Sequence, residues 1–247
     1  PNPISGSRVE GTVLDPAFSS FVGLYPLPQR HGMTIGEIAR YLQQVYFSAL
    51  VLDVVQIKDW QREMYFPETG LPWAMPSPNM PLWETALVYP GMCLLEATNL
   101  SEGRGTTRPF EIFGASWIDG WQLCNRLNRL PLKGVYFRPI QFLPTFHKFS
   151  GEICEGAFIH VTDRNQFEPV LTTIALLQEI VRRYPGKFEW KQPPYEYEYQ
   201  KLPFDILAGN TWLREAIIGL NPLDKIREQF REEVRQFEPT RREYLIY

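Results

Sequence analysis

Cysteine and histidine are scarce in this chain of 247 residues, with three of each. No two of the cysteines (Cys93, Cys124 and Cys154) have a C-x-x-C spacing, which argues against a zinc ribbon and a dithiol redox site, and at most one disulfide can form. No apolar run reaches the roughly 18 to 20 residues of a membrane span. The formal charge is only −3, so we expect neither a disordered tail nor a nucleic-acid-binding surface.

Proline, glycine and aromatic residues are abundant instead. The chain has 22 Pro and 17 Gly, and 14% of its residues are aromatic. Because the prolines stand among aromatic and aliphatic residues, we predict long loops that pack against the protein. Hydrophobic residues make up 44% of the sequence, which is enough for a globular core.

The N-terminal third predicts a helix followed by a buried strand. Thr34 and Glu37 form a capping-box pattern at the start of an amphipathic helix over residues 34–47. Residues 50–57 are a short apolar run typical of a strand in a parallel sheet. We therefore expect the C-terminal part of a Rossmann-like domain, whose first strand and helix belong to a missing or separate N-terminal half-domain. Residues 67–90, with six prolines, predict a rigid connection without regular structure.

The remainder predicts alternating strands and helices. We expect strands at residues 92–96, 135–142 and 157–161, and helices from Ser116/Asp119 to about Leu130, from Pro169, and over residues 223–237 with a break or bend at Pro239. The fold class is therefore α/β, with the remainder of a Rossmann-like domain (1–86) and a C-terminal α+β domain (87–247).

Common nucleotide and hydrolase motifs are absent. Gly103 and Gly105 lack the third glycine of the dinucleotide fingerprint, and no P-loop, G-x-S-x-G or H-E-x-x-H pattern occurs. We expect no cofactor and no metal. The histidines (His31, His147 and His160) are most simply interpreted as structural.

Residues 96–111 are the densest polar stretch of the chain. Arg104 stands between two glycines, which permit a close backbone approach and could direct its guanidinium at a carboxylate or phosphate ligand. Glu96, Glu102 and Glu111 are candidates for acid/base work on a glycosidic or amide bond. The alternative is a structural loop in which Arg104 pairs with one of these glutamates, and the sequence does not decide between them.

Another stiff loop precedes the C-terminal part of the chain. Prolines at 76, 78 and 81 preset an extended conformation that could present Asn79 to a ligand. The alternative is a simple linker.

Motifs along the whole chain resemble those of the secreted exo-β-N-acetylmuramidases of the NamZ type. The matching stretches are Pro1-Asn2-Pro3-Ile4-x-Gly6, Glu10-Gly11, Phe21-Val22-Gly23, His31-Gly32-Met33-Thr34-x-Gly36-Glu37, Thr69-Gly70-Leu71-Pro72-Trp73, Pro76-Ser77-Pro78-Asn79-Met80-Pro81, Tyr89-Pro90-Gly91, Thr98-Asn99-x-Ser101-Glu102-Gly103-Arg104-Gly105-Thr106-Thr107-x-Pro109-Phe110-Glu111 and Arg242-Glu243-Tyr244-Leu245-Ile246-Tyr247. Ala97 stands where the family usually has Gly. The family's preceding segment, with a Glu-His-Gly motif, is not in this sequence.

The resemblance implies a hydrolase that removes terminal N-acetylmuramic acid from the non-reducing ends of peptidoglycan fragments, and a secreted or periplasmic location. On this interpretation the catalytic candidates are Glu102 and Glu96, and Arg104 binds the lactyl carboxylate of the sugar. Further substrate contacts are expected from Asn79, Asn99, Ser101, Thr106, Thr107 and His31. Two alternatives stay open: the absent segment supplies the main acid, or the chain is a non-catalytic module that binds muramyl sugars.

Overall fold

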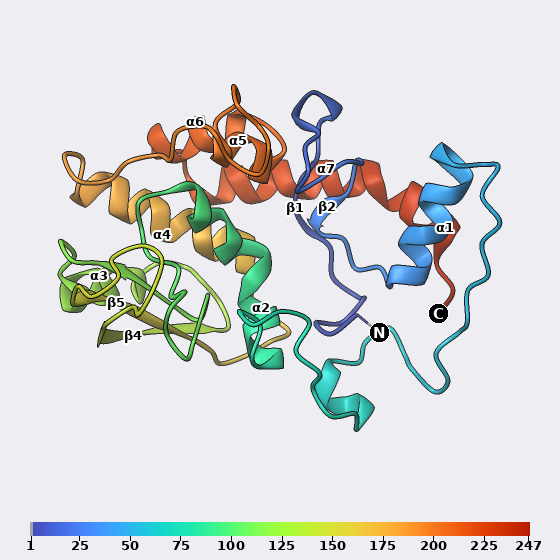
Figure 1. The fold of residues 1–247 in the computed structure, drawn as a ribbon, viewed down its shortest axis with the longest axis horizontal. Helices are drawn as coiled ribbons and strands as arrows, with labels where there is room; N and C mark the ends of the chain where they lie inside the picture. The colour runs from blue at the N-terminus through green and yellow to red at the C-terminus, as the bar shows by residue number, and fades with distance from the viewer. Residues whose placement is uncertain (1) are drawn as a thin grey trace.

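A computed structural model describes residues 2–247 and shows a mixed helix-and-sheet protein, as expected (Figure 1). Pro1, the first residue of the Pro-Asn-Pro motif, lies outside the described residues. The first part contains the antiparallel pair β1 (Glu10–Val13) and β2 (Pro28–Arg30), the short 3₁₀ helix η1 (Pro16–Phe18) and helix α1 (Ile35–Tyr46). A second 3₁₀ helix, η2 (Phe66–Thr69), follows a long irregular stretch.

Helix α1 begins where the capping box predicts. The Thr34 side chain accepts a hydrogen bond from the Glu37 backbone N–H at 3.3 Å, and the Glu37 carboxylate accepts one from the Thr34 N–H at 2.7 Å. The fully buried Glu37 also pairs with Arg62, which ties the helix to the irregular stretch. The helix therefore depends on local capping and on a long-range ion pair.

The predicted strand at residues 50–57 is wrong. This segment forms an irregular loop along one edge of the molecule (Figure 1), with Val51 95% and Val55 88% exposed. A strand needs a neighbouring strand for its backbone hydrogen bonds, and the described residues offer none here. Only one side of the segment is covered, where Val54 approaches Gly36 of α1.

The proline-rich segment begins within η2 and is then irregular only as far as residue 82. Helix α2 (Trp83–Met92) then begins and contains Pro90 near its end, and the 3₁₀ helix η3 (Cys93–Ala97) follows directly. The predicted strand at 92–96 is therefore wrong as well. A short apolar run cannot distinguish a buried helix from a strand, and here α2 packs against α4 with most of its residues buried.

The C-terminal part is built on a three-stranded antiparallel sheet of order β3-β5-β4. Its strands are β3 (Ile112–Ala115), β4 (Val135–Phe142) and β5 (Cys154–Val161), and the last two confirm predicted strands. Helix α3 (Gly120–Leu127) packs on β4 and β5 and has Asp119, not Ser116, as its N-cap. Asp119 accepts a hydrogen bond from the Gln122 N–H at 2.9 Å.

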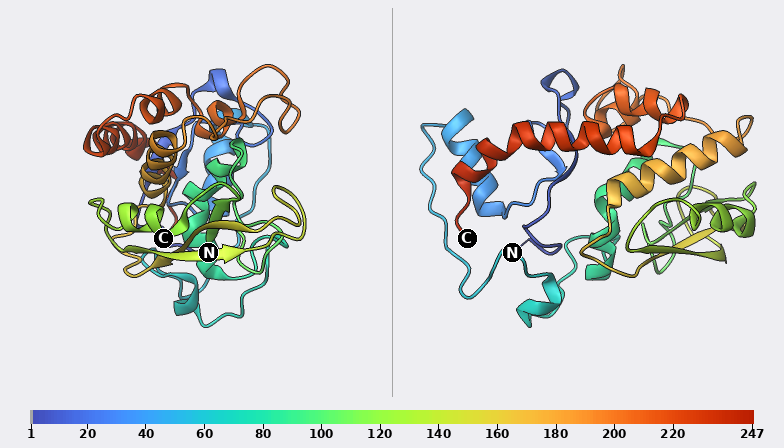
Figure 2. Two further views of the ribbon diagram at one scale, coloured as in Figure 1. Left: turned by 90° about the vertical axis from the view of Figure 1, so that its left-hand side faces the viewer. Right: turned by 180° about the vertical axis from the view of Figure 1, so that it is seen from behind.

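Four further helices complete the molecule. Helix α4 (Pro169–Arg183) starts at the predicted proline and is buried almost throughout, against α2, α3, α6 and α7. Helices α5 (Pro203–Ala208) and α6 (Trp212–Ile218) lead into α7 (Leu223–Tyr244), which continues through Pro239 instead of ending there. The back view in Figure 2 shows α7 crossing from α4 toward α1, with its last turns inclined.

Helix α7 packs on both parts of the chain. It contacts β1 and α1, and Phe237 and Tyr244 share a buried cluster with Met33 and Tyr41. The larger core lies between α2, the sheet and α4. The domain boundary between residues 86 and 87 stays a prediction. Helix α7 contacts elements on both sides of it.

Glu10 of β1 should make stability depend on pH. Burial raises its pKa from 4.5 to about 7, and the negative charge of Glu168 adds to this rise. The hydrogen bond from the Leu171 N–H and the positive charges of Arg30 and Arg8 lower the pKa by smaller amounts. Because the folded state holds this proton more tightly, the stabilisation is complete below pH 4.5 and is lost as the pH rises through 7. The loss amounts to roughly 3 kcal/mol, at about 1.4 kcal/mol per pKa unit.

We therefore expect Glu10→Gln to flatten the pH dependence of the free energy of unfolding between pH 5 and 8. Urea titrations of both proteins across this range would measure the effect. Glu228→Gln, at an exposed position of α7, is the matched control and should retain the wild-type slope. An unchanged slope in Glu10→Gln would contradict the assignment.

Candidate active site

The loop of residues 98–111 joins η3 to β3 and is tightly packed. The Ser101 N–H donates to the Gly114 carbonyl at 2.8 Å, and the Phe110 N–H donates to the Glu102 carbonyl at 2.6 Å. Gly103 and Gly105 have φ of +79° and +82°, and a Cβ would lie 2.7 Å from the Ile112 carbonyl oxygen and 2.6 Å from that of Phe146, respectively. These glycines are needed because backbone segments meet at the loop.

Arg104 is held inside the protein by the two glutamates proposed as catalytic. It lies 2.8 Å from Glu96 and 3.2 Å from Glu102, and its guanidinium faces the Phe110 ring. Glu96 also accepts a hydrogen bond from the Tyr195 hydroxyl at 2.9 Å. These contacts match the alternative interpretation of a bridged structural loop.

Glu102 is completely buried against Arg104, Lys148 and His147. Lys148 lies 2.9 Å from one carboxylate oxygen, and His147 lies 3.3 Å from the other. Burial lowers the pKa of Lys148, whose ammonium also donates to the Leu95 and Leu100 carbonyls at 2.9 Å. A carboxylate enclosed in this way has little room to reach a sugar.

The other predicted contact residues are divided between internal bonds and the surface. Asn99 bridges to the Lys187 carbonyl and the Glu189 N–H, and Ser101 accepts from the Gly103 N–H. Thr106 closes a turn by donating to the Gly103 carbonyl at 2.6 Å. Thr107 is the exposed member of this group.

The structure does not bring His31 to this loop. His31 lies in the segment between β2 and α1, two elements that Figure 1 shows well away from β5. Its Nδ1 accepts a hydrogen bond from the Met33 N–H at 3.0 Å. Burial, reinforced by Arg241, lowers its pKa to about 4, so the ring is a neutral structural group. Asn79 lies in the turn that leads into α2.

A cavity of about 820 Å³ opens beside the same loop, on the side of Glu111. Its walls come from the first half of α2, the end of β5 and the turn that follows. The lining includes Trp83, Glu84, Arg108, Glu111, Phe158, His160, Asp163, Arg164 and Asn165. We call this cavity the cleft.

Glu111 is the buried carboxyl group of the cleft. It is 4% exposed, accepts a hydrogen bond from the Thr85 hydroxyl at 2.7 Å and lies 3.3 Å from Arg108. Burial raises its pKa, with a further contribution from Glu84, although Thr85 and Arg108 act in the opposite direction. Such a group keeps its proton to a higher pH than an exposed glutamate.

Aromatic and basic groups surround this carboxyl group. The guanidinium of Arg108 lies 5.9 Å from the Phe158 ring, and His160 stacks on the same ring at 4.3 Å. Arg164 lies over Tyr65 and pairs with Glu68. The cleft thus offers a partly buried aromatic face and two arginines, a combination suited to an acidic sugar.

On the sequence alone, Glu111 was considered beside Glu96 and Glu102, but only the other two were selected as catalytic. Arg108, Phe158, His160 and Arg164 were also missed. Arg108 occupies the unmatched position of the loop motif (Thr107-x-Pro109), so the resemblance did not point to it. Phe158, His160 and Arg164 follow that loop by many residues, and only the pairing of β3 with β5 brings them near it.

Two family models match consecutive parts of this chain. "Exo-beta-N-acetylmuramidase NamZ, N-terminal" matches residues 1–84, and "Exo-beta-N-acetylmuramidase NamZ, C-terminal" matches residues 87–247. The chain belongs to the NamZ family.

Relatives of this family cover the whole chain but are longer. The peptidoglycan beta-N-acetylmuramidase NamZ of Bacillus subtilis (strain 168) is 44% identical over 247 residues, which are 100% of this chain and 58% of that protein. Two DUF1343 family proteins of Bacteroides fragilis NCTC 9343 have similar crystal structures, with TM-scores of 0.86 and 0.71 at 30% and 25% identity. Each match covers 100% of this chain and 64% of the other. The chain thus spans about three fifths of the length of these NamZ-family relatives.

The described residues contain no candidate membrane span and no candidate metal site. Within residues 2–247, no helix is both long and apolar enough to cross a membrane. In the same part of the chain, no group of three or more His, Cys, Asp or Glu side chains is arranged to hold a metal ion. All three cysteines are free.

The contacts of Arg104 predict a structural effect of its replacement. Arg104→Lys should lower the free energy of unfolding by about 1–3 kcal/mol, because a lysine cannot hold both glutamates with a planar fork. Sugar preference should change little. Arg108→Lys, at the mouth of the cleft, should instead reduce the preference for muraminides over glucosaminides.

Thermal melts and rates on both sugar types, measured with the longer family protein, would test this pair of variants. A loss of muraminide preference in Arg104→Lys at unchanged stability would support the role in binding the lactyl carboxylate that the sequence suggests.

Proposed function

We propose that this chain forms part of the active site of an exo-β-N-acetylmuramidase, which removes terminal N-acetylmuramic acid from the non-reducing ends of peptidoglycan fragments. The observation that carries the proposal is the pair Glu111 and Arg108 in the wall of the cleft. Glycosidases need one carboxyl group that keeps its proton until it protonates the leaving oxygen. Glu111, buried and with a raised pKa, has this property.

The neighbouring groups supply the other requirements of the reaction. Arg108 can contact the lactyl carboxylate that distinguishes N-acetylmuramic acid from N-acetylglucosamine, and Phe158 offers an apolar face for a sugar ring. Glu84, exposed on the first turn of α2, is a second carboxyl group on the cleft wall. Glu96 and Glu102, engaged in ion pairs, then stabilise the loop that carries Arg108.

The alternative is a non-catalytic module that holds a muramyl sugar. The ion pairs of Glu96 and Glu102 favour it, because they remove both predicted catalytic carboxylates from the reaction. Glu111 is then the buried carboxyl group on the wall of the cleft. In that case either a carboxyl group outside this chain completes the reaction, or the sugar is bound without being cleaved.

Rates on a chromogenic N-acetylmuraminide, with this chain and with the longer family protein, would separate the two functions. If either protein cleaves the N-acetylmuraminide but not the matching N-acetylglucosaminide, the result supports the muramidase. Saturable binding of the sugar without cleavage by either supports the binding module. Neither cleavage nor binding would contradict both.

We propose further that residues 1–86 belong to a Rossmann-like domain completed by an additional segment. Val51 and Val55 are almost fully exposed, although their spacing suits a strand. The longer relatives contain residues that this chain does not match, and packing of such a segment on residues 50–57 would cover these valines. We also propose a secreted or periplasmic location, because peptidoglycan lies outside the cytoplasmic membrane.

A further inference from the structure

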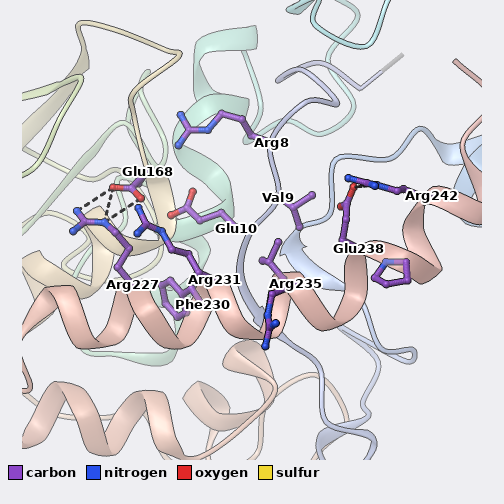
Figure 3. A pocket seen from close by; sticks show the side chains of 12 residues that line it. Arg8, Val9, Glu10, Glu168, Arg227, Phe230, Arg231, Arg235, Glu238 and Arg242 are labelled. Atoms are coloured by element: carbon purple, nitrogen blue, oxygen red, sulfur yellow. Dashed lines mark hydrogen bonds and ion pairs between the residues drawn. The ribbon is translucent and has the colours of Figure 1, made fainter.

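A second cavity, of about 740 Å³, lies between α7 and the residues that enter β1 and α4. We call it the α7 groove. Figure 3 shows Arg8, Glu10 and Glu168 on one side and Arg227 and Arg231 of α7 on the other. The turn that precedes α4 separates the groove from the cleft, because Asn165 lines the cleft and Glu168 lines the groove.

The groove is basic, although the whole chain is acidic. Five arginines and three glutamates line it, while the formal charge of the chain is −3. Several of these charges neutralise one another: Arg227 pairs with Glu168 at 3.1 Å, and Arg242 pairs with Glu238 at 2.9 Å. Arg235 pairs with Glu232 at 2.7 Å and points away from Glu10 in Figure 3.

Two of the five groove arginines, Arg8 and Arg231, form no ion pair with residues 2–247. Arg8 donates only to the backbone carbonyls of Asn165 and Phe167, at 2.6 and 3.0 Å, which fixes its guanidinium without neutralising it. Arg231 forms neither a hydrogen bond nor an ion pair with the described residues, and in Figure 3 its side chain rises toward Glu10 and Glu168. A guanidinium fork of this kind is a natural partner for a carboxylate or phosphate.

Glu10 provides the second, independent sign of a ligand. It is 6% exposed; one carboxyl oxygen accepts the Leu171 N–H at 3.0 Å, and the other is buried without any partner. Unpartnered buried polar atoms are uncommon in folded proteins and call for a partner. In its protonated form this oxygen would donate a hydrogen bond.

Apolar side chains form the floor between these charges. Val234 of α7 and Val9 are half-buried and line the groove above Phe230, which is itself only 3% exposed, and the walls are contributed by three separate elements. An inorganic ion would leave this floor uncovered. A compact organic anion would cover it and place its charged end at the arginines.

We propose that the α7 groove binds a small organic anion, whose carboxylate or phosphate group lies between Arg8 and Arg231 and accepts a hydrogen bond from Glu10, while its hydrocarbon part covers Val9 and Val234. This site is separate from the cleft, and its existence does not depend on the muramidase activity.

Calorimetric titration of this chain at pH 6 with glutarate, inorganic phosphate and the neutral glutaramide would test the proposal. Saturable binding of glutarate that exceeds binding of glutaramide by at least tenfold is expected. Phosphate tests the oxyanion contacts without an apolar body and should bind more weakly. No saturable binding of glutarate, or equal binding of all three, would overturn the proposal.

Matched arginine variants locate the site. Arg231→Ala should weaken glutarate binding at least tenfold, whereas Arg235→Ala, four residues away on the same helix, should change it less than twofold. Equal effects of the two variants would mean general screening and would contradict a specific site.

A pH series identifies the role of Glu10. Glutarate binding to the wild type should weaken as the pH rises from 6 to 8, since ionised Glu10 repels the anion. Glu10→Gln, which keeps a neutral donor, should bind at both pH values. Circular dichroism of each variant confirms that it is folded, and parallel pH curves for the two proteins would exclude Glu10 from the site.

Discussion

Replacing Glu111 with Gln in the longer family protein should lower kcat by about 10²- to 10⁴-fold, the usual contribution of a positioned general acid. The physical reason is its environment: the carboxyl group is 4% exposed on the wall of the cleft, and burial raises its pKa. A glutamine cannot deliver the proton. Initial rates on a chromogenic N-acetylmuraminide, with KM measured separately, would determine the effect.

The pH profile distinguishes proton transfer from a structural role. An acid works only while protonated, so activity should fall as the pH rises through the pKa of Glu111. Thr85 donates to this carboxylate at 2.7 Å and lowers its pKa, so Thr85→Val should move the alkaline limb to higher pH. An unmoved limb, or a Glu111→Gln variant changed only in KM, would show that Glu111 binds the substrate without transferring a proton.

Replacing Glu102 with Gln should mainly destabilise the protein, by about 3–5 kcal/mol, the typical cost of leaving a buried charge without its partner. Lys148 would lose the carboxylate 2.9 Å away, and Arg104 the one 3.2 Å away. Urea unfolding of the variant would measure the loss, with Glu228→Gln as the exposed control. The kcat of the folded fraction should stay close to that of the wild type.

The double variant Glu102→Gln/Lys148→Met should recover part of the stability, because it removes both buried charges together. This outcome would identify Glu102 as a structural anion. A stable Glu102→Gln protein with kcat reduced a hundredfold would instead restore the proton-transfer role that the sequence suggested.

The sequence predicted which loop carries the candidate site, but not the role of each residue in it. The glycines, threonines and charged residues of 96–111 mark a polar segment from sequence alone, and the structure places that segment against the cleft. Three glutamates in one loop look alike in a sequence, since their spacing does not show what each carboxyl group faces. Glu102 faces Lys148, whereas Glu111 lines the cleft, because the pairing of β3 with β5 brings the end of β5 beside Glu111.

Several elements follow from local sequence chemistry alone. The capping box at Thr34, the proline that opens α4 and the apolar stripe of α7 each act within one or two turns of helix, so nearby residues are enough to predict them. Strand β4 and most of β5 could also be predicted, because both are long and contain β-branched and aromatic residues.

Other features were decided only by contacts between distant residues. Residues 50–57 have a strand-like composition but no neighbouring strand among the described residues, and a strand cannot form its hydrogen bonds alone. Residues 92–97 are apolar enough for a strand, yet packing of α2 against α4 makes them the end of a helix and a 3₁₀ turn. The sequence by itself determined where α1, α4 and α7 begin and which loop is polar. Tertiary packing decided which carboxyl groups are enclosed by ion pairs of the loop and which one lines the cleft, because charge pairing and desolvation depend on separations in space.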